Sequence, residues 1–494
     1  MGSAAALFKP DWLTYPSDPA ALDLTIWESS FQRDETGELT VDGTPVSALR
    51  EQFGTPAYVF SESVFRARAR GFREAFTEAF AHHGAEVSVY YAGKSFLCTA
   101  VAAWAKDEGL NLDTASGGEL AVGLRAGMPG ERIALHGNNK SEAELRRALE
   151  NNVGRIVADS ADEVRLIARV AADMGVTAPV MLRLTPGVHA STHDFIATAH
   201  EDQKFGQSLV PGTAQLAGFH ADELESMGLR TDDAYATVSV ALALAADHID
   251  LRGFHCHIGS QIFEAEGFSQ AAKKVLGYLN EINHRFNVTL PEIDLGGGYG
   301  IGYVEGEKPR AARDVATELA DSVSKTCADL GMAIPHLSFE PGRSIAGPSG
   351  ITLYTVGTIK NVSIEDEHGD TRVRRYVSVD GGMSDNARPV LYEADYTAVL
   401  ANRAPEGDQV LSRVVGKHCE SGDIVVRYVY LPEDLKAGDV LAVPATGAYC
   451  YALSSNYNML TRPPVVATSA DAEPRAIVRR ETEDDLLARD LGNV

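Results

Sequence analysis

Short apolar runs alternate with longer stretches of helical spacing through the middle of the chain. Eight such runs are predicted to be strands, at 87–92, 110–115, 133–137, 155–158, 179–184, 251–258, 292–295 and 336–339. Helical spacing is found in the segments 98–108, 117–126, 141–151, 161–174, 232–248, 267–286 and 312–330. Eight strands that alternate with helices predict a (β/α)8 barrel, with an open doubly wound sheet as the alternative.

The pattern changes on both sides of this region. After residue 349, β-branched runs separated by Gly, Pro and Asp predict an antiparallel β domain, with strands at 351–359, 372–379, 423–430 and 439–443. Near the N-terminus, 39–46 indicates a strand, turn and strand, and 56–60 a short extended segment. We therefore expect an N-terminal segment (1–61) that joins the β domain (349–494), and a barrel over 62–348. The segment 187–232 is longer than a normal connection and is interpreted as an insertion.

Composition and charge narrow the classes of function. The chain has 494 residues, 45% hydrophobic and 23% charged, which is typical of a soluble globular protein. A formal net charge of -25 argues against a broad surface that binds nucleic-acid phosphates. The five cysteines are scattered and fit a reducing compartment. No apolar run approaches transmembrane length and no secretory signal is evident, so we expect a cytoplasmic protein without nucleic-acid or membrane partners.

One lysine stands where a predicted strand gives way to a helix. The run 87–92 is followed by Gly93 and Lys94, and helical spacing begins at Cys98. In a parallel α/β fold this point is the carboxyl end of a strand, where ligand sites collect. An amine that is partly desolvated there loses its proton more easily and can attack a carbonyl. A solvated loop lysine is the ordinary alternative, and the other strand ends decide between the two.

Several other strands also end in ligand-type residues. They provide an imidazole with a hydroxyl, consecutive glycines whose backbone N–H groups can approach an anion, and an acid near a base. These groups lie in His255-Cys256-His257-Ile258-Gly259-Ser260, Asp294-Leu295-Gly296-Gly297-Gly298 and Glu340-Pro341-Gly342-Arg343. Each motif alone is weak evidence, because a tight turn or a surface ion pair would explain it. Together with Lys94 they make up a pyridoxal phosphate (PLP) site: a Schiff-base lysine, a phosphate cradle and an acid for the ring nitrogen.

The whole set of motifs closely resembles that of diaminopimelate decarboxylases, PLP enzymes that pair an alanine-racemase-like barrel with a β domain. The resemblance extends from about Gly54 to Asp490. Its motifs are Tyr91-Ala92-Gly93-Lys94, His257-Ile258-Gly259-Ser260, Gly296-Gly297-Gly298, Glu340-Pro341-Gly342-Arg343, Cys419-Glu420-Ser421-Gly422-Asp423 and Gly447-Ala448-Tyr449. A metal ion is not implied.

The resemblance implies roles for the residues around the cofactor. Lys94 would bond to it covalently, His257 would stack on its ring, and Glu340 would face the pyridine nitrogen. A carboxylate there favours a protonated ring, which is a good electron sink and favours decarboxylation over racemisation. The other implied cofactor-binding residues are Asp113, Ser260, Gly297, Gly298, Gly342, Arg343 and Tyr449.

The resemblance also implies a substrate and a shared site. Diaminopimelate carries a remote amino-carboxylate, which a guanidinium can bind in two-pronged fashion. The implied substrate-binding residues are Arg343, Arg388, Tyr392, Glu420 and Tyr449. Cys419 would be the catalytic acid that protonates the carbanion, reaching the active site of the other subunit in a homodimer.

The expected reaction is therefore conversion of meso-diaminopimelate to L-lysine and carbon dioxide. Two alternatives stay open at this point. One is a decarboxylase of ornithine, arginine or carboxynorspermidine, which the motif Arg388-Pro389-Val390-Leu391-Tyr392 disfavours. The other is a PLP-binding protein without turnover, which the long region after residue 349 disfavours, because such proteins are single barrels.

Overall fold

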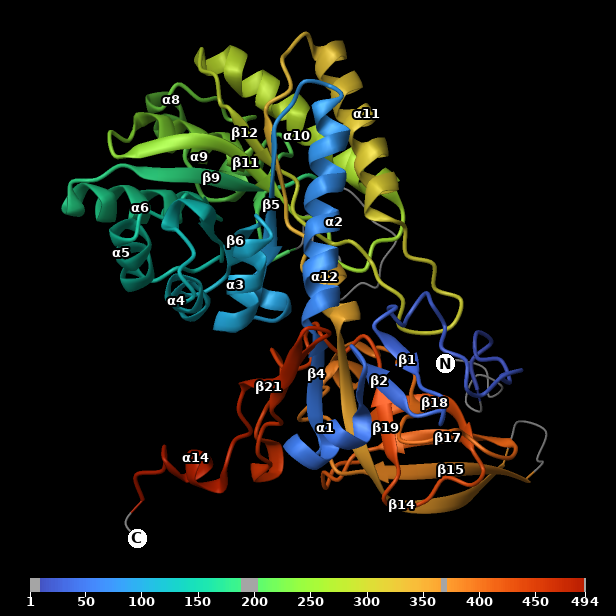
Figure 1. The fold of residues 1–494 in the computed structure, drawn as a ribbon. Coiled ribbons are helices and arrows are strands. Elements are labelled where there is room, and N and C mark those ends of the chain that lie inside the picture. The colour runs from blue at the N-terminus through green and yellow to red at the C-terminus, as the bar shows by residue number, and fades with distance from the viewer. Residues whose placement is uncertain (1–8, 188–202, 366–370, 493–494) are drawn as a thin grey trace. The chain divides into compact units, whose positions relative to one another are not determined.

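The computed structural model describes residues 9–187, 203–365 and 371–492 (Figure 1). Contacts divide the chain into two compact units. The barrel unit comprises Arg68–Gly300 and Arg310–Gly342, and the β unit comprises Met1–Ala67, Ile301–Pro309 and Arg343–Val494. The domain boundaries expected from the sequence, after residues 61 and 348, stay a prediction.

The barrel unit contains a closed parallel sheet. Its eight strands are β5 (Val87–Ala92), β6 (Asn111–Thr114), β7 (Ile133–Leu135), β8 (Arg155–Ala158), β9 (Ala178–Thr185), β11 (Ile249–Cys256), β12 (Glu292–Asp294) and β13 (His336–Phe339). Each strand pairs in parallel with the next, and β13 pairs with β5 to close the ring. The predicted barrel is therefore confirmed, and the open sheet is excluded.

Helices between the strands cover the outside of the barrel (Figure 1). They are α3 (Thr99–Asp107), α4 (Gly117–Arg125), α5 (Glu142–Glu150), α6 (Ala161–Met174), α9 (Tyr235–Ala245), α10 (Ala265–Phe286) and α11 (Ala312–Leu330), with short η2 (Gly93–Ser95) and η3 (Gly130–Arg132). Local capping fixes the starts of α5 and α6: at α5 the Ser141 side chain accepts from the Glu144 N–H and the Glu144 carboxylate accepts from the Ser141 N–H, which forms a capping box. At α6 the Ser160 side chain accepts from the Glu163 N–H, and Gly175 ends the helix in the left-handed conformation.

The insertion expected at 187–232 is only partly described, since residues 188–202 lie outside the described ranges. Its described part contains β10 (Gln207–Ser208), α7 (Thr213–Leu216) and α8 (Ala221–Ser226). β10 pairs in parallel with β9, so this segment extends the barrel sheet by one short strand.

The β unit is built on the long strand β14 (Gly350–Glu365), which pairs with β15, β19 and β4. The other strands of this sheet are β4 (Ala57–Ser61), β15 (Thr371–Val379), β16 (Val399–Leu400), β17 (Gln409–Val415), β18 (Ile424–Pro432), β19 (Val440–Val443), β20 (Val465–Ser469) and β21 (Ala472–Val478). Most pairs are antiparallel as predicted, but β15 with β17 and β20 with β4 are parallel. These two pairs arise because the chain returns to the sheet through long connections.

The N-terminal segment joins the β unit, as predicted. β4 lies between β14 and β20, and a small sheet of β1 (Phe31–Arg33), β2 (Leu39–Val41) and β3 (Thr44–Pro45) precedes α1 (Val46–Phe53). Trp27, Phe31 and Leu39 are buried with Leu353 and Val440 in one hydrophobic cluster. Burying these side chains against β14 and β19 stabilises the attachment by roughly 1.5–3 kcal/mol for each large one.

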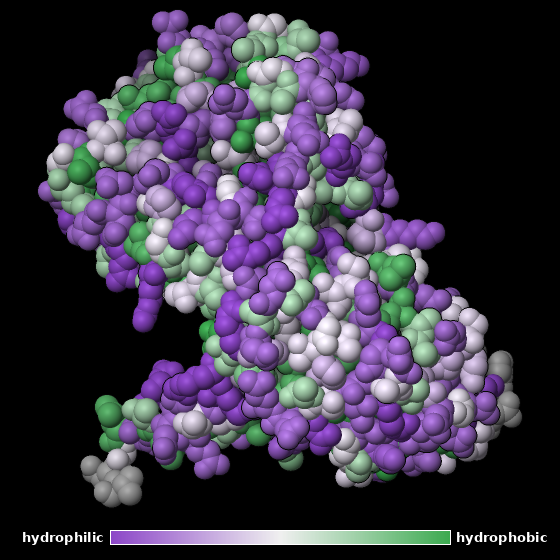
Figure 2. All heavy atoms as spheres, viewed as in Figure 1, coloured by the Kyte–Doolittle hydropathy of each residue, from purple (hydrophilic) through white to green (hydrophobic). Residues whose placement is uncertain are grey.

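The remaining helices are α2 (Glu62–Ala81), which crosses the boundary at Ala67, and α12 (Arg343–Ser349), α13 (Arg388–Tyr392), η5 (Tyr457–Met459) and α14 (Glu483–Leu487). Hydrophilic residues cover most of the surface that Figure 2 shows, in keeping with the many charged residues. Among the described residues, no helix combines the length and the apolar character needed to cross a bilayer.

Candidate active site

Lys94 lies at the carboxyl end of a barrel strand, as predicted. It is on η2 directly after β5, and a Cβ at the preceding Gly93 would come within 2.9 Å of the Asp113 carbonyl oxygen. Burial raises the pKa of Asp113 and lowers that of His257; the Lys94 charge opposes the first shift and adds to the second, so the amine lies near both groups. Lys94 itself is exposed, which corrects the expectation of partial desolvation: the residue is on a short turn at the open end of the strand.

A buried cluster of acids and imidazoles lies beside this strand end. His136, just after β7, places its Nε2 atom 3.3 Å from Asp113 Oδ1 and 3.1 Å from Glu340 Oε1. His255 on β11 places its Nε2 atom 3.4 Å from the same Glu340 oxygen. All four side chains are buried. The resemblance implied Asp113 and Glu340 but not the two histidines that connect them.

The neighbours decide the charge of each buried acid. Burial pushes the pKa of Glu340 upwards, but His136 and His255 outweigh burial and hold this pKa well below its usual range. Burial raises the pKa of Asp113, and raises that of Asp294 still further, with the Glu340 charge adding to the effect. Burial lowers the pKa of His255 to about 4, so this imidazole is neutral. The two imidazoles therefore favour the ionised form of Glu340, whereas burial favours the neutral forms of Asp113 and Asp294.

His136, His255 and Glu340 also offer ligand atoms within 4.8 Å of one another, a spacing that a metal ion could use. The contacts of the Glu340 carboxylate with His136 and with the neutral His255 ring account for the same spacing without a metal. The sequence motifs imply no metal ion either.

Glycine loops line the same end of the barrel. A Cβ at Gly297 would lie 2.0 Å from the Glu340 carbonyl oxygen, and one at Gly298 would lie 2.4 Å from the Gly259 carbonyl oxygen. A Cβ at Gly342 would lie 2.8 Å from the Ala92 Cβ. Only glycine permits this close approach of three strand-end loops, and it keeps their backbone N–H groups accessible to an anion.

His257 and Ser260 follow β11 in one of these loops, and both are half-buried. The Gly297 N–H donates to His257 Nδ1 at 3.3 Å, so the proton of the neutral ring is on Nε2. Burial, together with the charges of Lys94 and Arg183, holds the pKa of His257 well below its usual range. The ring is therefore neutral and can stack on a planar ligand.

The β unit contains a second group of predicted residues. Arg343 and Arg388 each have 7% relative exposure. Arg343 Nη1 donates to the Tyr303 hydroxyl at 2.6 Å, and the Arg388 guanidinium lies over the Tyr303 ring at 4.8 Å. Arg343 also lies 4.6 Å from the centroid of the Tyr449 ring. The structure therefore brings Arg343, Arg388 and Tyr449 together around Tyr303, which sequence reasoning missed.

Arg388 has tyrosine partners in place of a carboxylate. Within the described residues, its Nη1 donates to the Tyr396 hydroxyl at 2.6 Å, and its guanidinium is near the rings of Tyr303 and Tyr396. A buried cation with neutral partners is electrostatically unfavourable until an anion reaches it. Tyr392 ends the short helix that Arg388 begins, so the two lie one turn apart on one face. These contacts suit a carboxylate ligand.

Cys419 and Glu420 lie on the turn between β17 and β18, and both are exposed. The Cys419 N–H donates to Asn458 Oδ1 at 3.2 Å, and the Glu420 carboxylate accepts from the Gly422 N–H at 3.2 Å. Of the described cysteines, Cys419 is the exposed one, while Cys98 is half-buried and the others are buried. The predicted thiol acid is thus accessible on a surface turn.

Comparison with known proteins identifies the family. Residues 65–231 and 224–347 match the family model described as "Pyridoxal-dependent decarboxylase, pyridoxal binding domain". The diaminopimelate decarboxylase of Corynebacterium efficiens is 47% identical over 466 residues, which cover 94% of this chain and 94% of that protein. This chain belongs to the diaminopimelate decarboxylase family. The family resemblance stated from the motifs is confirmed.

Further diaminopimelate decarboxylases agree in sequence and in fold. The Mycobacterium leprae protein is 47% identical over 96% of this chain and 95% of its own length. The crystal structure of the diaminopimelate decarboxylase from M. jannaschii in complex with L-lysine has a TM-score of 0.81 at 30% identity, covering 94% of this chain and 98% of that one. As a member of this decarboxylase family the chain is an enzyme, so the hypothesis of a PLP-binding protein without turnover is wrong.

Proposed function

We propose that this enzyme converts meso-2,6-diaminopimelate to L-lysine and carbon dioxide with PLP, the last step of lysine biosynthesis. The observation that carries the substrate assignment is the buried pair of guanidinium groups, Arg343 and Arg388, around Tyr303. Substrates such as ornithine have a cation at their remote end and would be repelled there. Diaminopimelate has a carboxylate at that end, which forms charge-assisted hydrogen bonds with a guanidinium.

The residues of the barrel unit fit a pyridoxal phosphate. Lys94 supplies the amine, the glycine loops bring backbone N–H groups together for the phosphate, and His257 supplies a neutral ring. We assign Asp113, Ser260, Gly297, Gly298 and Gly342 to cofactor binding, with Arg343 and Tyr449 from the β unit. PLP, when bound, withdraws the electron pair that departing carbon dioxide leaves on the α-carbon.

Glu340 has the clearest chemical task in this proposal. Since His136 and His255 keep it ionised, it holds a proton on the pyridine nitrogen by charge attraction. Arg388 and Tyr392 hold the remote carboxylate of the substrate. The Glu420 carboxylate accepts hydrogen bonds from the remote ammonium group of the substrate. The Cys419 thiol delivers the proton to the α-carbon after carbon dioxide has left.

The reaction is tested with a panel of amino acids. Purified enzyme with added PLP should release carbon dioxide from meso-diaminopimelate, and L-lysine should accumulate in equal amount. L-ornithine, L-arginine and carboxynorspermidine should be turned over at least about a hundredfold more slowly, because each lacks the carboxylate that Arg388 binds. Faster release from any of these three would contradict the substrate assignment.

The proposed working form is a cytoplasmic homodimer in which Cys419 serves the site of the other subunit. Lys94→Ala and Cys419→Ala dimers are each inactive under this proposal, but a mixed dimer has one intact site. Random exchange makes about half of the dimers mixed, so activity should recover to roughly a quarter of the native value. Subunit exchange verified by mass spectrometry without recovery would mean that Cys419 serves its own subunit or none.

A further inference from the structure

The turn of η5, which faces the Cys419 loop, has a strained backbone. Asn458 and Met459 both adopt the left-handed conformation, with φ of 52° and 58°. Two consecutive non-glycine residues in this region are rare, because Cβ approaches the following carbonyl oxygen. Such strain persists only where the surrounding structure imposes it, and it is often found at functional sites.

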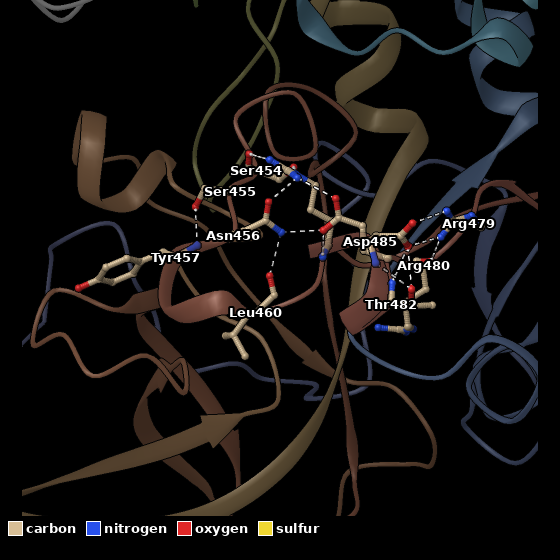
Figure 3. A network of polar contacts seen from close by, with 11 residues as sticks. Ser454, Ser455, Asn456, Tyr457, Leu460, Arg479, Arg480, Thr482 and Asp485 are labelled. Atoms are coloured by element: carbon tan, nitrogen blue, oxygen red, sulfur yellow. Dashed lines mark hydrogen bonds and ion pairs between the residues drawn. The ribbon is translucent and has the colours of Figure 1, made fainter. Parts of the chain in front are cut away.

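A polar network holds this turn in place (Figure 3). Asn456 Nδ2 donates to the Leu460 carbonyl oxygen at 3.0 Å and to Glu481 Oε2 at 2.6 Å. Arg462 Nη1 donates to Asn456 Oδ1 at 2.6 Å and to Glu481 Oε1 at 2.8 Å. The Ser455 N–H donates to the Ser384 carbonyl oxygen at 3.0 Å. The C-terminal segment therefore fixes both ends of the turn.

The turn presents one side-chain oxygen to the segment that carries the thiol. Asn458 Oδ1 lies 3.2 Å from the Cys419 backbone nitrogen, which donates to it, and 3.3 Å from His418 Nδ1. The Tyr457 ring stacks on the His418 ring, with centroids 5.4 Å apart and an interplanar angle of 25°. The strained residue is thus the one whose side chain joins His418 to Cys419.

His418 is buried and is held on its other sides too. Its Nε2 lies 2.9 Å from Ser384 Oγ and accepts from the Ser384 N–H at 3.3 Å. Since a backbone N–H can only donate, Nε2 is the acceptor and Nδ1 carries the proton that is donated to Asn458. The His418 N–H donates to Asp423 Oδ2 at 2.8 Å, which ties the two ends of the loop together. One neutral tautomer satisfies all of these contacts.

We propose that His418 is a positioning residue which, through Asn458, fixes the backbone of Cys419 and so places its thiol for proton transfer. This inference rests on the proposed function, in which Cys419 is the proton donor. The donor stands on an exposed turn, and its backbone N–H is held by Asn458. A misplacement of about 1 Å costs about a hundredfold in rate, so the neighbouring contacts matter to catalysis.

A matched pair of glycine variants separates positioning from stability. Asn458→Gly and Met459→Gly both replace a left-handed residue by glycine, which relieves the strain. Only Asn458→Gly also removes the oxygen that His418 and Cys419 share. We expect kcat to fall about a hundredfold in Asn458→Gly and to stay native in Met459→Gly, with KM and PLP content unchanged in both.

Variants of His418 test the tautomer. Asparagine places an N–H near the Nδ1 position and can keep the bond to Asn458, whereas alanine and glutamine cannot. His418→Asn should retain kcat within about threefold, while His418→Ala and His418→Gln should lose about as much as Asn458→Gly. His336→Asn is the control, because His336 Nε2 makes a similar 2.9 Å contact with Ser88 Oγ in the barrel unit. Its kcat should not change.

A second readout does not depend on turnover. Cys419 is the exposed cysteine among the described residues, so its alkylation by iodoacetamide can be followed by peptide mass spectrometry. Releasing its backbone should change the alkylation rate several-fold in Asn458→Gly and His418→Ala, and not in Met459→Gly. Melting temperatures show whether each variant is folded, and His418→Asn keeps the test valid if His418→Ala does not fold.

The outcomes distinguish this inference from the proposed function. Cys419→Ala is measured in the same series. If it keeps native kcat, the assignment of Cys419 as proton donor is wrong, and the positioning role for catalysis is wrong with it. If Cys419→Ala loses activity while Asn458→Gly and His418→Ala keep native kcat and native alkylation rates, only the positioning role is overturned.

Discussion

Glu340→Gln tests the charge that the buried cluster is built to hold. The substitution keeps the shape of the side chain and removes the negative charge 3.1 Å from His136 Nε2 and 3.4 Å from His255 Nε2. An amide cannot hold the pyridinium proton by charge attraction. We expect a loss of about 3 kcal/mol in transition-state stabilisation, which is about a hundredfold in kcat.

The same change alters how stability depends on pH. The pKa of Glu340 is depressed in the folded protein, so its contribution is complete above its unfolded pKa of about 4.3 and is lost as pH falls through the folded value. The pKa of His136 is raised, since Asp113 and Glu340 outweigh burial, so its contribution is complete below about pH 6.5 and is lost as pH rises through the folded value. Removing Glu340 should flatten both slopes of the stability profile.

Asp294→Asn is the matched control. Asp294 is a buried acid near Glu340, but burial raises its pKa well above its usual range and so favours its neutral form. An asparagine is uncharged and can donate a hydrogen bond, so it matches that neutral form. Carbon dioxide release is measured at saturating substrate and corrected for PLP content, and stability is measured by urea unfolding between pH 4 and 9. Native kcat in Glu340→Gln, or an equal loss in Asp294→Asn, would refute the reasoning.

Three further predictions concern the amine, the guanidinium and the absence of a metal. Borohydride reduction of the native enzyme should fix PLP to the peptide that contains Lys94, and a label on another peptide would contradict the assignment. Arg388→Ala should lower kcat/KM for diaminopimelate about a hundredfold and leave PLP binding intact, whereas Arg413→Ala, which removes a similar contact with Tyr376, should have no effect. The enzyme should contain no stoichiometric metal and should keep its activity in EDTA, despite the spacing of the cluster around Glu340.

The barrel could be predicted from the sequence because its signals are local. Each strand is a short apolar run followed by a helix, so alternation alone reveals the fold, and α6 is found at the predicted bounds, Ala161–Met174. The motif residues at the ends of β5, β11, β12 and β13 were found for the same reason, because the end of an apolar run in the sequence marks the end of a strand in the structure.

The β unit was less predictable because its pairings are remote in sequence. β4 pairs with β14 and β20, which follow it by roughly 300 and 400 residues, and its five residues indicate only an extended segment. Tyr303 was missed for a similar reason: it follows the barrel glycines in sequence, yet its contacts are with Arg343 and Arg388. A single tyrosine between two motifs does not reveal in the sequence that it contacts these two arginines.

The ionisation of the buried acids could not be predicted from the sequence. Asp113, Asp294 and Glu340 are all acids at or near the ends of barrel strands, and all three are buried. Burial alone would raise all three pKa values and favour the neutral form of each acid. Only Glu340 has two imidazoles around one carboxylate oxygen, and these come from β11 and from the loop after β7. Closing the barrel therefore does more than collect the side chains, because it brings two imidazoles to one of three similar acids and lowers the pKa of that acid alone well below its usual range.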